Sequence, residues 1–407
     1  MVNLYSRCSS ATNKEGNQFV GVRYDGDVEI KFPIGYRIPT DEKELRKEIL
    51  LLIRSFNLTK SVNKNSMNNG TYYKEEFKFP IYSYFWLIKD FIDKGLYKIR
   101  EKEITQKATG KINWKKTIQK THPLIANDGF VYFEPYFEKS RNTDTLITEI
   151  EKYCLNLAND FFGWLFGEIK VPKSIFNDRK INYMKCILQK ELVVSFSDYK
   201  KSLLTHMLNI LTGLDDDIQN SKIYSYGTEN YDVVWEKLVF EVFGNVRHIE
   251  EYYPLASWNL SKLNLGNKEL SPLRQDAIYA DKNTGKYYIL DAKYYRTSQN
   301  KDLSGLPSSS DIEKQITYGQ ELVNNKGIDP QNVYNALILP FNMNKNHFKL
   351  KENIEYIGNA NPSWVEKKYP YQNVELLFVD TRYLLNRWKK NNELDIDNMI
   401  KIIEKNI

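Results

Sequence analysis

The stretch SPLRQDAIYADKNTGKYYILDAKYY, residues 271–295, decides the fold of the C-terminal half of this 407-residue chain. Two apolar runs in it, AIY and YYIL, flank the turn sequence KNTG, and this pattern predicts a β-hairpin. Asp276 begins the first predicted strand and Asp291 ends the second. Because antiparallel pairing around the turn brings these strand ends together, we expect the two carboxylates to be neighbours.

Asp291 and Lys293 are two positions apart, so the period of a strand places their side chains on one face. Two carboxylates aimed at one point repel each other unless a cation lies between them, and such hard oxygen ligands suit Mg²⁺ or Mn²⁺. A lysine beside the metal can orient or deprotonate an attacking water and stabilise charge on a phosphate. The pattern therefore predicts metal-dependent phosphodiester hydrolysis. The alternative is a surface ion pair worth about 0–1 kcal/mol.

Two flanking helical segments supply further candidate residues. In YDVVWEKLVFEVFG, Glu236 lies beside the apolar stripe and is either a third acidic metal ligand or an ordinary solvated glutamate. In DIEKQITYGQELV, Asp311 is expected to cap a helix that carries Gln315 and Tyr318 on one face. Both can hydrogen-bond a phosphate or the water beside the lysine, although helices carry such pairs routinely.

The rest of the C-terminal sequence completes an α/β pattern. Residues 332–340 and 374–380 are short apolar runs typical of buried strands, and residues 381–388 continue as a helix. The order helix, hairpin, helix, strand, strand, helix predicts an α/β domain over residues 222–407, with a mixed central sheet flanked by helices.

The N-terminal half predicts an α+β region, residues 1–213, that engages a partner or DNA. It begins with a predicted hairpin over residues 20–32 and a helix capped by Thr40, and helical spacing extends from about residue 145 to 213. The polar, acidic stretch between residues 213 and 222 is the expected domain boundary.

The segment 95–120 carries eight lysines and arginines against two glutamates, an excess equal to the +6 of the whole chain. Such a basic, aromatic-bearing segment either contacts phosphate or an acidic partner, or is a solvated strand and loop. The candidate contact residues for DNA or a partner are Lys111, Trp114, Lys115 and Lys116.

The composition of the chain argues against several other classes of protein. An apolar content of 42% is ample for folded cores, and the three scattered cysteines give no disulfide framework or zinc motif. The sequence begins without a charged and apolar leader, and it contains no run of about 18 apolar residues. We therefore expect a cytoplasmic protein that does not associate with a membrane.

The candidate site residues, in their order along the chain, resemble the PD-(D/E)XK nuclease superfamily. Its pattern is matched by Asp276 and by Asp291-Ala292-Lys293, although Gln275 occupies the place of the usual proline. More narrowly, four segments resemble the LlaJI family of restriction endonucleases, relatives of the McrC nuclease subunit: FPIGY, GKINWKKTI, YGTENYDVVWEKLV and YYILDAKYY.

The resemblance implies a bacterial restriction nuclease whose C-terminal half cuts double-stranded DNA with Mg²⁺, for which Mn²⁺ can substitute. The metal ligands would then be Asp276, Asp291 and Glu236. Lys293 would serve the water and the transition state, and Gln315 and Tyr318 would support Lys293 or the DNA backbone. The N-terminal half would engage a separate GTP-hydrolysing AAA+ motor, since the sequence has no GxxxxGK[ST] phosphate loop.

Two other hypotheses remain open. One is a self-sufficient type II restriction endonuclease whose N-terminal half reads DNA, and the other is a noncatalytic adaptor with a degenerate nuclease domain. Since cutting both strands needs two active sites or one used twice, a homodimer during cleavage is expected.

Overall fold

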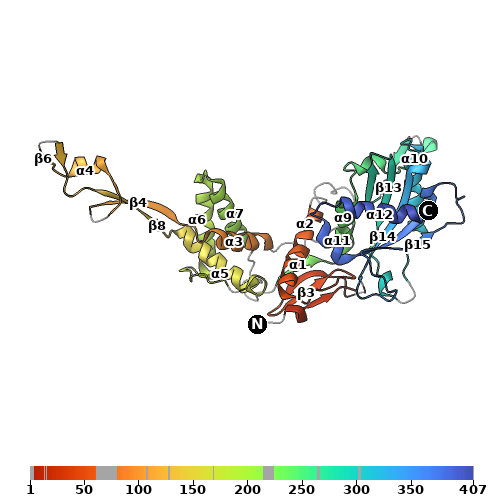
Figure 1. The fold of residues 1–407 in the computed structure, drawn as a ribbon, viewed down its shortest axis with the longest axis horizontal. Helices are drawn as coiled ribbons and strands as arrows, with labels where there is room; N and C mark the ends of the chain where they lie inside the picture. The colour runs from red at the N-terminus through yellow and green to blue at the C-terminus, as the bar shows by residue number, and fades with distance from the viewer. Residues whose placement is uncertain are drawn as a thin grey trace. The chain divides into compact units, whose positions relative to one another are not determined.

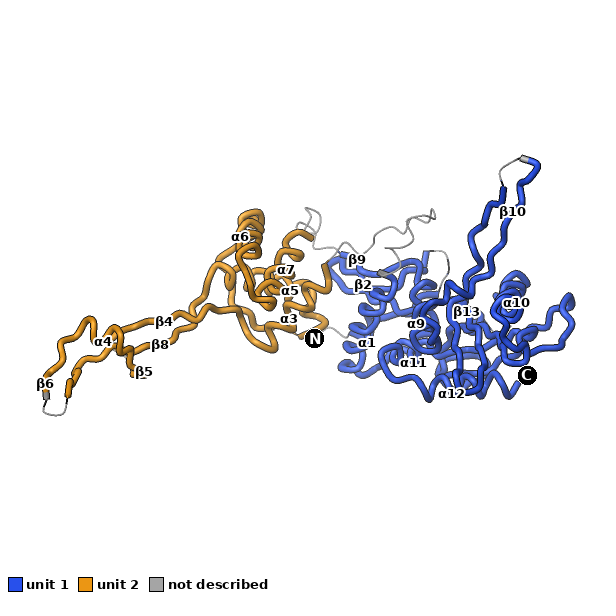
Figure 2. The backbone as a smooth tube through the Cα atoms, turned by 90° about the horizontal axis from the view of Figure 1, so that it is seen from above, with its two compact units in different colours: residues 1–77, 223–407 blue, residues 78–222 orange. Residues whose placement is uncertain are grey.

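The computed structural model describes residues 4–60, 80–213 and 224–406, apart from residues 13, 15, 107, 108, 127, 128, 168, 264, 265 and 301–303 (Figure 1). The chain forms two compact units, of which unit 1 comprises residues 1–77 and 223–407 and unit 2 comprises residues 78–222 (Figure 2). The expected boundary stretch, residues 214–222, lies outside the described residues.

The central sheet of unit 1 has five strands in the order β12-β13-β14-β16-β15. Its three middle strands are parallel, and both outer strands are antiparallel to their neighbours, so the predicted mixed sheet is confirmed. Its strands are β12 (Ala277–Asp281), β13 (Lys286–Ala292), β14 (Val333–Phe341), β15 (Ile354–Ala360) and β16 (Val374–Asp380). Every residue of β14 is buried, as expected for a central strand that is covered on both faces.

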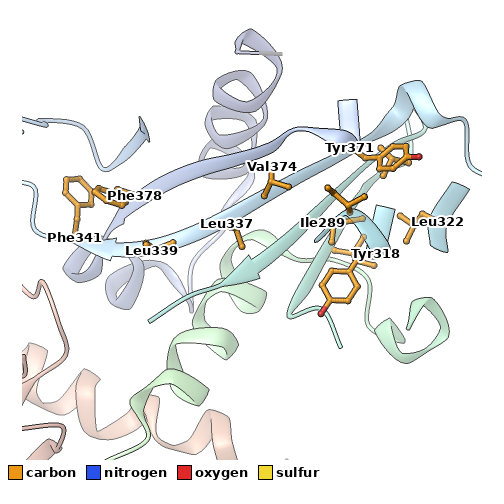
Figure 3. Packing of buried hydrophobic residues seen from close by; sticks show 12 residues of the cluster. Ile289, Tyr318, Leu322, Leu337, Leu339, Phe341, Tyr371, Val374 and Phe378 are labelled. Atoms are coloured by element: carbon orange, nitrogen blue, oxygen red, sulfur yellow. The ribbon is translucent and has the colours of Figure 1, made fainter. Parts of the chain in front are cut away.

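Helices cover both faces of this sheet. Leu337 of β14 faces helix α10 (Ser309–Asn324), where it joins a core cluster with Ile289, Leu322 and Phe378 (Figure 3). The neighbouring residue Ile338 points the other way, and its carbonyl oxygen accepts a hydrogen bond from the indole of Trp235 at 3.4 Å. The other α-helices in the described residues of unit 1 are α1 (Glu42–Ser55), α2 (Asn57–Lys60), α9 (Tyr231–Phe243), which carries Trp235, α11 (Thr381–Arg387) and α12 (Glu393–Lys405).

A second sheet of unit 1 joins the two ends of the sequence. Its order is β1-β3-β2-β9, with strands β1 (Cys8–Ser10), β2 (Val20–Tyr24), β3 (Val28–Phe32) and β9 (Tyr224–Thr228). The predicted hairpin over residues 20–32 is therefore present. Helix α1 is capped by Asp41, whose side chain accepts from Glu44 N, and not by Thr40 as predicted.

The structure has a unit boundary after residue 222, at the end of the predicted boundary stretch, but the N-terminal residues belong to the same unit as residues 223–407. The described N-terminal residues up to 60 pack with the C-terminal residues, because β9 pairs with β2 and the Arg382 side chain forms an ion pair with Glu48. Both contacts join residues that are far apart in sequence, and local periodicity carries no information about such pairs.

The shorter elements of unit 1 lie in the connections. They are η1 (Leu4–Arg7), η4 (Ile249–Tyr252), η5 (Ser261–Leu263), η6 (Thr297–Gln299), η7 (Pro330–Asn332), η8 (Pro370–Gln372), and the two-stranded ribbon of β10 (Ser257–Asn259) and β11 (Asn267–Glu269).

Unit 2 is a group of packed helices that carries a long antiparallel ribbon (Figure 2). The helices are α3 (Ile81–Lys94), α5 (Leu146–Phe166), η3 (Asp178–Lys180), α6 (Ile181–Val194) and α7 (Asp198–Thr212). The ribbon consists of β4 (Ile99–Thr105) and β8 (Phe137–Thr143), and it ends in β5 (Lys111–Ile112), α4 (Trp114–Lys120), β6 (Leu124–Ala126) and β7 (Gly129–Val131). Within the described residues, no helix is long and apolar enough to cross a membrane.

Candidate active site

The end of strand β13 places Asp291 and Lys293 together, as the strand period predicts. Lys293 Nζ lies 2.5 Å from Asp291 Oδ2, and the side chain of Asp291 is only 7% exposed. The Lys293 N–H continues the strand ladder by donating to the Ile338 carbonyl oxygen at 2.9 Å. Burial lowers the pKa of Lys293, but the charge of Asp291 outweighs it and leaves this pKa above its usual value. The lysine is therefore held as an ammonium group.

Asp276 is tied to the same strand end. Ala277 pairs with Leu290 in the hairpin, and Asp276 Oδ2 accepts a hydrogen bond from Ala292 N at 2.7 Å. Burial and the negative charge of Asp291 raise the pKa of Asp276 well above its usual value. The two aspartates are thus neighbours, as the hairpin predicts, and the charge of Asp291 disfavours the ionised form of Asp276.

Glu236 reaches this cluster from helix α9. Burial, followed by the charges of Asp232 and Asp291, raises its pKa to about 7, and Lys293 partly offsets the effect. Glu236 is therefore not the ordinary solvated glutamate of the alternative hypothesis.

The three acidic side chains are suitable in chemistry for a divalent metal, because carboxylate oxygens are the ligands that Mg²⁺ prefers. Burial is the main cause of their raised pKa values, and the charges of neighbouring carboxylates add to it. In the part of the chain that the structure describes, however, no three His, Cys, Asp or Glu side chains form a ready-made metal site. The metal ligands therefore remain a prediction.

Asp311 is a second partner of the lysine that the sequence analysis missed. Its Oδ1 lies 3.5 Å from Lys293 Nζ. We predicted Asp311 as the cap of α10, but Ser308 is the cap and Asp311 is the third helical residue, whose carboxylate accepts from Ser308 N. The spacing Ser308-x-x-Asp311 of a capping box was the signal for this arrangement.

Gln315 and Tyr318 are buried on α10, and each donates a hydrogen bond to a backbone carbonyl oxygen. Gln315 Nε2 donates to the Ala336 carbonyl oxygen at 3.2 Å, and the Tyr318 hydroxyl donates to the Arg274 carbonyl oxygen at 2.9 Å. The structure thus gives Tyr318 a role in fixing the chain just before Asp276. Contact of either residue with Lys293 or with DNA stays a prediction.

Gln275, which stands in place of the usual proline, is buried just before Asp276. Its Nε2 donates to the Tyr252 carbonyl oxygen at 3.0 Å. The side chain therefore anchors the entry to β12 through a hydrogen bond that a proline could not form.

The segment FPIGY, residues 32–36, packs directly beside the candidate site. Ile34 N donates to the Tyr294 hydroxyl at 2.7 Å, and the Thr381 hydroxyl donates to the Ile34 carbonyl oxygen at 2.7 Å. Gly35 has φ +70°, and a Cβ atom there would lie 2.8 Å from the backbone of Phe341. Only glycine fits this approach without displacing the chain.

The basic segment of unit 2 is exposed at the end of its ribbon. Lys111, Trp114 and Lys115 are exposed, whereas Lys116 Nζ donates to the Ile104 carbonyl oxygen at 3.2 Å. The same end also exposes apolar side chains that the sequence analysis did not single out: Ile118, Leu124, Ile125, Phe130, Val131 and Phe133. We call these residues, with Trp114, the apolar tip.

The fold and site define an α/β protein that presents two aspartates, a glutamate and a lysine at one end of its central sheet. The family model for the LlaJI restriction endonuclease matches residues 19–361, and the chain therefore belongs to this family. The resemblance that the four sequence segments indicated is thus confirmed.

Two known proteins are similar to this chain. The type II restriction enzyme BsuMI component YdjA of Bacillus subtilis (strain 168) is 26% identical over 320 residues, which cover 76% of this chain and 66% of that protein. The chain thus spans just under two thirds of the relative's length. A refined half-complex from the tetradecameric assembly of Thermococcus gammatolerans McrB AAA+ hexamers with bound McrC aligns with 96% of this chain and 83% of the matched chain. At 12% identity and a TM-score of 0.36, this similarity does not establish a shared fold.

Proposed function

We propose that this chain is the DNA-cutting subunit of a restriction system and that its C-terminal part is a PD-(D/E)XK nuclease domain. The single observation that carries the proposal is the Lys293–Asp291 pair at 2.5 Å beside Asp276, which Ala292 N holds at the same strand end. Membership of the LlaJI restriction endonuclease family supports DNA as the substrate.

The metal would be Mg²⁺, with Mn²⁺ as a substitute, held by Asp276, Asp291 and Glu236. When bound, it supplies Lewis-acid polarisation of the phosphate and a template for the attacking water. Lys293, held as an ammonium group by Asp291, donates to that water or to a phosphate oxygen as negative charge develops. Asp311, 3.5 Å from Lys293 Nζ, limits the directions in which the ammonium can point.

We further propose that a separate AAA+ GTPase subunit works with this chain. The relative in Bacillus subtilis is called a component of its restriction enzyme, which implies further subunits there. In this chain, the apolar tip exposes large side chains beside Lys111 and Lys115, and exposed apolar clusters of this kind mark surfaces that bind a partner. Ile125 is 84% exposed and Phe133 74% exposed, which makes them the first residues to change in a binding test.

Plasmid cleavage with Mg²⁺ and the partner subunit tests the site. We expect Asp291→Ala to abolish cleavage, because it removes a metal ligand and the counter-ion of Lys293. The matched control is Asp281→Asn at the other end of the same hairpin, where the carboxylate is solvated and bonds only its own turn. Equal cutting by Asp291→Ala and the wild type would refute the site assignment.

One observation favours a second candidate, a noncatalytic adaptor: the described residues contain no ready-made group of three metal ligands. Titration with Mn²⁺, followed by calorimetry, separates the two. The nuclease binds Mn²⁺ and loses that binding in Asp291→Ala, whereas the adaptor shows no binding in either protein.

A further inference from the structure

A cavity of about 830 Å³ lies at the end of the central sheet in unit 1. Its walls come from the segment after β1, the turn after β3, helix η6 and the loop after β14. This volume is within the roughly 300–1,000 Å³ of typical ligand sites. We call this space the β14 cavity. None of the residues proposed above as metal ligands or catalytic groups lines this cavity.

The lining of the β14 cavity is polar and basic. It includes Arg37, Lys345 and His347 together with neutral side chains such as Asn342 and Gln299, and none of its described lining residues is acidic. A concave surface that offers cationic and amide donors without carboxylates selects for anions. Arginine in particular matches the geometry of phosphate oxygens.

Arg37 lines this cavity and also a neighbouring pocket that contains Glu44 and Glu48. Its Nε is buried and has no hydrogen-bond partner among the described residues. The acidic group whose charge acts on it is Asp380, but the two oxygens of that carboxylate accept from Met343 N at 2.9 Å and Tyr383 N at 2.8 Å. The part of Arg37 that lines the cavity is therefore a cationic group that an anionic oxygen from a ligand can contact.

The loop that carries Lys345 is fixed by its own hydrogen bonds. Asn342 Oδ1 accepts from Asn344 N at 3.0 Å and from Lys345 N at 2.9 Å. Asn346 Nδ2 donates to the carbonyl oxygens of Asn342, Met343 and Leu350. The backbone around the cation is thus ordered before any ligand binds, which lowers the entropic cost of binding.

The β14 cavity and the candidate active site share one strand. Lys293 N bonds Ile338, and Asn342 of the cavity follows four residues later in the same direction. At about 3.3 Å per strand residue, this separation is roughly 13 Å. One DNA strand has a phosphate for about every 3.4 Å of the duplex axis, so the cavity is within roughly four nucleotides of Lys293.

We propose that the β14 cavity binds a phosphate of the DNA strand a few nucleotides from the bond that is cut, through Arg37 and Lys345. That the bound phosphate belongs to DNA rests on the proposed function. A free nucleotide offers the same phosphate chemistry, and the experiment below distinguishes the two sources.

The test compares Lys345→Gln and Arg37→Gln with the control Lys351→Gln, a nearby exposed lysine that does not line the cavity. Fluorescence anisotropy of a labelled DNA duplex is measured in EDTA over a range of salt concentrations. We expect Lys345→Gln to weaken duplex binding about five- to ten-fold and to reduce the salt slope by about 1, as for the loss of one phosphate contact. The control should change binding less than two-fold. Lys345 is exposed, so its replacement leaves the fold intact even if Arg37→Gln does not.

A second arm measures inorganic phosphate and a nucleoside triphosphate by calorimetry. Loss of their binding in both cavity variants, with unchanged duplex affinity, would overturn the DNA source and assign the cavity to a free nucleotide. If both cavity variants bind the duplex, inorganic phosphate and the nucleoside triphosphate as tightly as the control variant does, the phosphate site itself is overturned. If Asp291→Ala abolishes cleavage while the cavity variants bind normally, the proposed function stands and this inference fails. If the wild type does not cut DNA but Lys345→Gln still loses phosphate, the inference stands alone.

Discussion

Replacing Arg382 by alanine should destabilise unit 1 far more than the loss of a surface ion pair. Arg382 donates from Nε and from the guanidinium NH2 group to Glu48 Oε1 at 2.8 and 2.7 Å, and the Tyr36 hydroxyl donates to Glu48 Oε2 at 2.6 Å. The Glu48 side chain is 5% exposed and that of Arg382 is 14% exposed. This bidentate pair joins helix α1 of the N-terminal segment to α11 of the C-terminal one.

The magnitude follows from the buried charge that the substitution leaves behind. Removing one partner of a buried ion pair costs about 3–5 kcal/mol, because the remaining charge has lost both its counter-ion and its water. Replacing both Arg382 and Glu48 by methionine should cost much less, since neither charge is then buried. Lys368→Ala is the matched control, because Lys368 and Glu366 form a 2.8 Å pair whose side chains are 57% and 76% exposed. Such an exposed pair is worth about 0–1 kcal/mol.

Urea unfolding measures the difference between these variants. At a slope of roughly 3 kcal/mol per molar urea, Arg382→Ala should lower the unfolding midpoint of unit 1 by about 1–1.7 M. Hydrogen exchange should show faster opening of α1 and α11 together, because both belong to the same cooperative unit. A midpoint that falls no further than in Lys368→Ala would refute the reasoning, and so would loss of protection in α11 alone.

Three other outcomes are expected. Glu151 in unit 2 is buried, and desolvation raises its pKa from 4.5 to about 7, so the folded state binds its proton more tightly than the unfolded state does. Unit 2 should therefore lose roughly 3 kcal/mol of stability as pH rises through this window, and melting curves of Glu151→Gln should lack that dependence. Gly35→Ala should destabilise unit 1 by more than about 1 kcal/mol, because it introduces both a strained φ and a clash with Phe341; an unchanged melting temperature would contradict the close approach. Light scattering on DNA-bound protein should give the mass of a dimer, and a monomer that cuts both strands at normal rates would remove the reason for dimerisation.

The elements that carry the candidate site could be predicted from the sequence. The turn KNTG between two apolar runs is a local signal, and it gave a hairpin whose register pairs Ala277 with Leu290. The strand period then placed Asp291 and Lys293 on one face. Both inferences depend on residues close in sequence, for which backbone geometry alone decides the neighbours.

The contacts that complete the site could not be predicted in this way. The hydrogen bond from Ile34 N to the Tyr294 hydroxyl joins residues 260 positions apart, and the pairing of β2 (Val20–Tyr24) with β9 (Tyr224–Thr228) also joins residues that are remote in sequence. A helix or strand signal shows which face is apolar but not which distant element covers it. For the same reason, the single region predicted for residues 1–213 differs from the units of the structure.

These long-range contacts explain physically why the FPIGY segment, residues 32–36, occurs in the same chain as Asp291-Ala292-Lys293. The Tyr294 hydroxyl that accepts from Ile34 N belongs to the residue directly after Lys293, and Thr381, which donates to Ile34, directly follows the last residue of β16. A shift of the 32–36 segment would therefore change both hydrogen bonds at the end of the sheet where Lys293 lies. These bonds involve backbone atoms of Ile34 and do not depend on the identity of its side chain, whereas at Gly35 the backbone itself must approach Phe341.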